Sequence, residues 1–220
     1  MEALFREYSG YWNEAVEAIG ETYRHANDTA GIRDVLEKWL SSDHPNRAWV
    51  ATEVIGKEKI QELAPSLFER LKLLARRKSP SERSLADTMV SSLGELRYDP
   101  ATEYLRAIVN AANRSYSNWA RGSTALRALA KTRPEIARDL YPRYVEWAVM
   151  TAHKGEPVPL LLVFGIIETS RDLDQWFSLV SDCKPADRQM LAKLMVGREW
   201  IRGEALANLG RVMPGVLSSP

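Results

Sequence analysis

The segment of residues 35–56 carries two apolar stripes separated by a short polar break. Leu36 and Leu40 lie on one side of a predicted helix, and Ala48 and Ile55 repeat this helical spacing after the break. Because each helix has a single apolar side, the hairpin cannot bury its core alone and has to pack against further hairpins. The segment therefore predicts an all-α chain of stacked helical hairpins, and the sustained period-two alternation typical of strands is absent from the sequence.

Apolar stripes of this kind recur along the chain at a nearly regular interval. Residues 119–122 and 200–203 share the pattern Trp-x-Arg-Gly. We expect the second helices of the hairpins to end at Gly56, Gly94, Ala130, Glu168 and Gly210. These ends are spaced close to the roughly 40 to 47 residues of such helical repeats. We predict an N-terminal capping helix in residues 1–29, an array of about five hairpins in residues 30–212 and a flexible tail in residues 213–220.

Proline and aspartate residues indicate where individual helices begin or bend. A first helix of one hairpin is predicted over residues 57–78, with a bend at Pro65. Asp99 is predicted to cap the next first helix, and Pro100 to occupy its first position. Pro142 is expected to bend the fourth first helix at a similar place, as in a repeated structure.

Residues 35–56 resemble one repeat of the HEAT family of α-solenoids. The matching residues are two leucines, a turn aspartate, an arginine that opens the second helix, a small residue and the helix end: Leu36, Leu40, Asp43, Arg47, Ala51, Ile55 and Gly56. The resemblance implies a right-handed α-α superhelix whose second helices line a concave face. It also implies a ladder of turn aspartates and second-helix arginines along the array, to which Asp43 and Arg47 would belong.

The composition restricts the compartment and the class of partner. The chain has 30 Lys and Arg against 29 Asp and Glu, a net charge of +1, whereas a protein held mainly by phosphates normally has a basic excess. Cys183 is the only cysteine, which excludes an intrachain disulfide and favours a reducing compartment. The longest apolar run, residues 158–167, is shorter than the roughly 20 residues that span a membrane. We therefore expect a cytoplasmic protein with no membrane segment and with nucleic acid as a less favoured partner.

The residue types that bind metals or act as nucleophiles form no recognisable set in the sequence. His25, His44 and His153 are the only histidines, and none has metal-ligand spacing to a second His, a Cys or a carboxylate. Cys183 has no histidine close in sequence, and no nucleophile or phosphate-loop motif occurs. We predict no catalytic residue, no metal and no cofactor.

Two alternatives of a different class remain open, and both are enzymes built from HEAT-like repeats. One is a DNA alkylpurine glycosylase, a family that uses tryptophans and a catalytic aspartate in a concave cleft and is marked by a Trp-Trp-Asp type segment. No Trp-Trp pair occurs here, but Trp49 and Asp87 would meet across neighbouring second helices, with Arg127 reaching a phosphate. The other alternative is a lyase that binds a chromophore or another small molecule.

The polar positions of the predicted second helices are expected to line an open groove. Trp49 points away from its own apolar stripe, as an aromatic binding anchor does. The partner-binding residues predicted on this basis are Trp49, Glu53, Asp87, Ser91, Ser123, Arg127 and Lys131. They run from acidic to basic along the chain, which would orient a partner of mixed charge, although an ordinary solvated face also mixes both signs. We therefore predict a non-catalytic scaffold, adaptor or regulatory protein, including the inhibitor or immunity type, that holds a partner protein or peptide.

Overall fold

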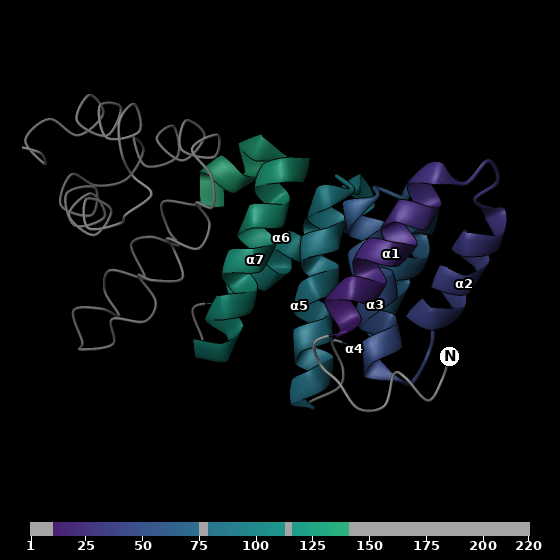
Figure 1. Cartoon of the computed structure of the whole chain (residues 1–220). Coiled ribbons are helices and arrows are strands. Elements are labelled where there is room, and N and C mark those ends of the chain that lie inside the picture. The colour runs from purple at the N-terminus through teal and green to yellow at the C-terminus, as the bar shows by residue number, and fades with distance from the viewer. Residues whose placement is uncertain (1–10, 75–78, 113–115, 141–220) are drawn as a thin grey trace, which may run out of the picture. The chain divides into compact units, whose positions relative to one another are not determined.

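A computed structural model describes residues 11–74, 79–112 and 116–140 of the chain. The regular structure in these ranges is helical, which confirms the all-α prediction (Figure 1). Residues 134–140 are helical, and the elements that precede them are α1 (Tyr11–His25), α2 (Ala30–Leu40), α3 (Pro45–Lys57), the 3-10 helix η1 (Gln61–Leu63), α4 (Ala64–Leu74), α5 (Pro80–Glu95), the 3-10 helix η2 (Asp99–Ala101), α6 (Thr102–Ala111) and α7 (Tyr116–Thr132). Predictions for residues 1–10 and 141–220, including Pro142, the later hairpins and the tail, lie outside the described residues.

The helices of the N-terminal part are arranged in two layers. The chain divides into two compact units, Met1–Leu105 and Arg106–Pro220. In the first unit, α3 packs against α1, α2 and α5, and α4 packs against α2 and α5. Helices α1, α3 and α5 therefore form one layer in this order, and α2 and α4 form the other. Helix α1 thus takes the place of a second helix beside α3.

The apolar stripes predicted from helical spacing are the core of the described helices. In the first unit the buried side chains that the spacing predicted are Leu36, Leu40, Ala48, Ala51, Ile55, Leu67, Leu71, Leu85, Met89 and Leu93. In the second unit Ala125, Leu126 and Leu129 of α7 are buried as well. These predicted core positions are therefore confirmed, whereas Val35, which was predicted on the same apolar stripe as Leu36, is 45% exposed.

Helices α3 and α5 end in the same way. Lys59 follows α3 and Arg97 follows α5, and both residues have positive φ angles, of 53° and 50°. The spacing along the chain from Lys59 to Arg97 is called one repeat below. After α3, the Ile60 amide donates to the Ile55 carbonyl at 3.0 Å, and the equivalent bond after α5 measures 3.1 Å. This is a Schellman ending, in which one left-handed residue lets the chain satisfy the last carbonyls of the helix. The sequence repeat is therefore also a repeat of backbone hydrogen bonds.

The chain after α3 differs from the single bent helix that was predicted there. Residues 57–78 were expected to form one bent helix, but Lys57 is the last residue of α3 and α4 begins only at Ala64, after η1. Pro65 is the second residue of α4, where no intrahelical bond needs its missing N–H, so the predicted bend within a helix is wrong. Helix α6 begins one repeat after α4, at Thr102, and is likewise preceded by a 3-10 helix.

Asp99 and Pro100 precede the α-helix that they were predicted to begin. Both belong to η2, which Asp99 begins, and they do not form the first positions of an α-helix. The Thr102 hydroxyl donates to the Asp99 carboxylate at 3.3 Å, so Asp99 still contacts the start of α6. The prediction was wrong in register because a turn of 3-10 helix was not recognisable from the cap signal.

Replacing Lys59 with glycine is expected to stabilise the protein by about 0.5 kcal/mol. The left-handed conformation costs an L-residue about 1 to 2 kcal/mol, which glycine avoids, while the extra chain entropy of glycine cancels about 0.5 to 1 kcal/mol. Urea unfolding measures the change. The matched control is Lys38→Gly within α2, which is expected to lose about 1 kcal/mol. A loss of stability in Lys59→Gly would contradict the positive φ angle.

Candidate partner-binding surface

Four of the predicted partner-binding residues lie on two neighbouring helices of the first unit. Trp49 and Glu53 belong to α3, and Asp87 and Ser91 occupy the positions one repeat later on α5. All four side chains are partly exposed. Because α1, α2 and α5 cover three sides of α3, positions spaced by four residues on the fourth side remain accessible. The structure therefore brings the helices of these four residues together, and we call their exposed side the α3–α5 face.

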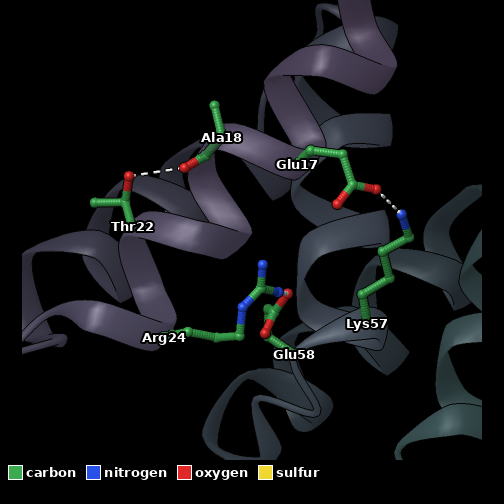
Figure 2. A network of polar contacts seen from close by, with 6 residues as sticks. All are labelled: Glu17, Ala18, Thr22, Arg24, Lys57 and Glu58. Carbon is green, nitrogen blue, oxygen red and sulfur yellow. Dashed lines mark hydrogen bonds and ion pairs between the residues drawn. The ribbon is translucent and has the colours of Figure 1, made fainter.

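Helix α1 adds charged side chains next to α3. The Lys57 ammonium, one turn beyond Glu53, forms an ion pair with Glu17 of α1 at 2.5 Å, as Figure 2 shows. Arg24 of α1 forms a second ion pair with Glu58, just beyond the end of α3 (Figure 2). The hydrogen bond and the charge of Lys57 hold the pKa of the exposed Glu17 carboxyl below its ordinary value. Lys57 and Arg24 are thus both engaged by carboxylates of their own chain.

Glu53 is the carboxylate with the most unusual surroundings on the α3–α5 face. Burial raises the pKa of Glu53 above its ordinary value of 4.5, and the charge of Lys57 offsets part of this rise. Within the part of the chain that the structure describes, Glu53 forms no hydrogen bond or ion pair. Since the folded state holds this proton more tightly than the unfolded chain, the contribution of Glu53 to stability falls as the pH rises from 4.5 through the raised pKa.

The other three predicted residues lie on α7 in the second unit. Ser123, Arg127 and Lys131 are spaced by four residues and therefore share one side of that helix. Arg127 and Lys131 are partly exposed, whereas Ser123 is only 6% exposed. The Nε atom of Arg127 is also buried. Ser123 is therefore less accessible than a groove-lining residue was expected to be.

The polar contacts between the α2 and α4 segments do not include Asp43 and Arg47, the two residues that the HEAT resemblance places in a ladder. Asp43 is exposed and forms no ion pair with Arg47. In the layer of α2 and α4, Arg33 of α2 pairs with Glu62 of η1 at 2.7 Å, and Ser66 of α4 donates to Glu37 of α2 at 2.8 Å. Arg70 of α4 donates to the carbonyl of Ser42, in the loop after α2, at 3.0 Å. No sequence signal distinguishes these residues from ordinary surface residues, because the two members of each pair belong to different elements and lie far apart in the chain.

No group of three or more His, Cys, Asp or Glu side chains is placed to hold a metal ion among the described residues. None of the described helices is long and apolar enough to cross a membrane. His25 and His44 are both exposed.

Comparison with known proteins finds no family, no curated protein and no solved structure that matches this chain. The function is therefore inferred from the geometry of the molecule itself.

Proposed function

We propose that the chain is a HEAT-like α-solenoid, a right-handed array of helical hairpins, that binds another protein or a peptide segment on the side of its second helices. The observation that carries this proposal is the structural repeat within the described helices. The segment made of α3, η1 and the start of α4 has the same order of elements as the segment made of α5, η2 and the start of α6. In both segments the first helix ends with the same Schellman hydrogen bonds. Units that repeat in this way stack side by side and create extended surfaces for partners.

The α3–α5 face has the composition of a binding surface. It combines a partly exposed tryptophan with charged and small polar side chains. Aromatic residues at the centre of an interface contribute most of the binding energy, while charged residues around them increase the association rate and the specificity. A role as an adaptor, a regulatory subunit or an inhibitor of a partner follows from such a surface. A cytoplasmic location belongs to the same proposal, because Cys183 is the only cysteine.

Site-specific photo-crosslinking in the native host tests this function. A benzophenone amino acid at Ser91, on the α3–α5 face, is expected to yield one adduct of defined mass. The same amino acid at Asp34, on the exposed side of α2, is the matched control and is expected to yield none. Equal adducts from both positions, or none from Ser91, would refute a partner held on the α3–α5 face.

A further inference from the structure

The α3 part of the binding surface pairs an aromatic ring with a carboxylate. Trp49 and Glu53 are four residues apart, so their Cβ atoms lie about 5 to 6 Å from each other on one side of the helix. Both side chains are partly exposed. An indole face attracts a cation through its quadrupole, and a carboxylate attracts the same cation through its charge and its hydrogen bonds. The pair is therefore chemically suited to an ammonium or guanidinium group.

The Glu53 carboxylate forms no hydrogen bond or ion pair within the described part of the chain, and the charge of Lys57 only partly offsets its burial. Lys57 is the nearest cation along α3, but its ammonium is held by Glu17 at 2.5 Å. Arg24 is held by Glu58 in the same way (Figure 2). A half-buried carboxylate without an ion-pair partner of its own is destabilised by the loss of water around it, and a cation from a partner would relieve this cost.

The neighbouring helices add further negative charge. Helix α1 carries the exposed carboxylates Glu14, Glu17 and Glu21, of which Glu17 is paired with Lys57, and α5 carries Asp87 and Glu95 along with the cation Arg83. Such a field accelerates the approach of a positively charged segment and repels the phosphates of nucleic acids or of a membrane surface.

We propose that Trp49 and Glu53, with the acidic side of α1 beside them, are the docking site for a basic segment of the partner protein. One arginine or lysine of that segment seats its cation between the Trp49 ring and the Glu53 carboxylate. This inference rests on the proposed function, since it names the chemistry of the partner that the α3–α5 face holds.

Binding of a fluorescently labelled nona-arginine peptide to the full chain, followed by anisotropy, tests the inference. Glu53→Gln keeps the shape of the side chain and removes the charge, and it is expected to weaken binding about tenfold. Trp49→Leu is expected to weaken it about threefold. Asp34→Asn is the matched control on α2, with the same change of charge, and is expected to change binding less than about twofold. Circular dichroism of each variant confirms that it is folded.

A second measurement reports the contact itself. The pKa of Glu53, followed by NMR of its labelled carboxyl carbon, is expected to fall when nona-arginine is added, because the bound cation stabilises the ionised form. The charged groups that its own helix and the packed helices contribute to this surface include Glu17, Lys57, Asp87 and Glu95. The carboxyl group of Asp34 on α2, away from this surface, serves as the internal reference in the same spectra.

The outcomes separate this inference from the proposed function. Equal loss of peptide binding in Glu53→Gln and Asp34→Asn would reduce the effect to overall charge and overturn the docking site. The absence of peptide binding, or equal binding of nona-glutamate, would overturn it as well. If the crosslink from Ser91 to a partner persists in either case, the binding function stands and only the basic segment is wrong. If that crosslink is also absent, both proposals fail.

Discussion

Replacing Leu93 with alanine is expected to lower the free energy of unfolding by about 3 kcal/mol. Leu93 is fully buried on α5, which packs against α3 and α4. Removing three buried carbon atoms loses their transfer free energy and leaves a cavity, a combination that costs about 2 to 5 kcal/mol for leucine. Urea unfolding, monitored by far-ultraviolet circular dichroism, measures the change.

Leu73→Ala is the matched control for this prediction. It removes the same atoms from α4, but the Leu73 side chain is 54% exposed, so the expected change is below about 0.5 kcal/mol. Similar losses in the two variants would mean that α5 does not bury Leu93 between the layers.

Replacing Gly56 with alanine is expected to cost about 2 kcal/mol, the net of overpacking and helix propensity. A Cβ atom at Gly56 of α3 would lie 2.6 Å from the Ser92 Oγ and 3.1 Å from the Ser92 Cα of α5. Ser92 cannot turn away freely, because its hydroxyl donates to the Thr52 carbonyl of α3 at 3.0 Å within the core. The helices must therefore separate, which costs up to about 3 kcal/mol, and the better helix propensity of alanine returns about 1 kcal/mol.

Gly31→Ala and a compensating double variant control the Gly56 prediction. No atom lies within 4 Å of a Cβ built at Gly31 on α2, so this substitution is expected to stabilise the protein by about 0.5 kcal/mol. Combining Gly56→Ala with Ser92→Gly removes the side-chain atoms that the new Cβ would meet and is expected to restore part of the lost stability. A stabilising effect of Gly56→Ala alone would show that α3 and α5 are not in close contact there.

Periodicity predicted the helices but not their exact ends. The apolar stripe of α4 was predicted correctly at Leu67 and Leu71, although the helix was expected to begin too early, at Lys57 instead of Ala64. An apolar stripe extends over many residues, so it is predicted correctly even when the first residue of the helix is not. A left-handed residue such as Lys59 gives no such signal, because lysine rarely adopts this conformation and only the packing around it selects it.

The candidate surface was predicted in part. Trp49 and Glu53 were selected because they fall outside the apolar stripe of α3, and both are partly exposed. Ser123 was selected by the same rule, yet it is almost fully buried. The rule follows the apolar side of one helix alone, whereas the exposure of a polar position depends on which other helices cover it.

The sequence by itself determined that the chain is helical, which side of each described helix is buried and how far apart its repeated elements lie. These properties depend on neighbours within one or two helical turns, so the order of the residues encodes them directly. Only the tertiary structure decided that α1 lies beside α3 in the same layer, that Lys57 and Arg24 are held by carboxylates, and that Glu53 forms no hydrogen bond or ion pair among the described residues. These properties arise from side chains on different helices, as Lys57 and Glu17 are. Their contacts form only when the layers pack, and no local pattern of residues specifies them.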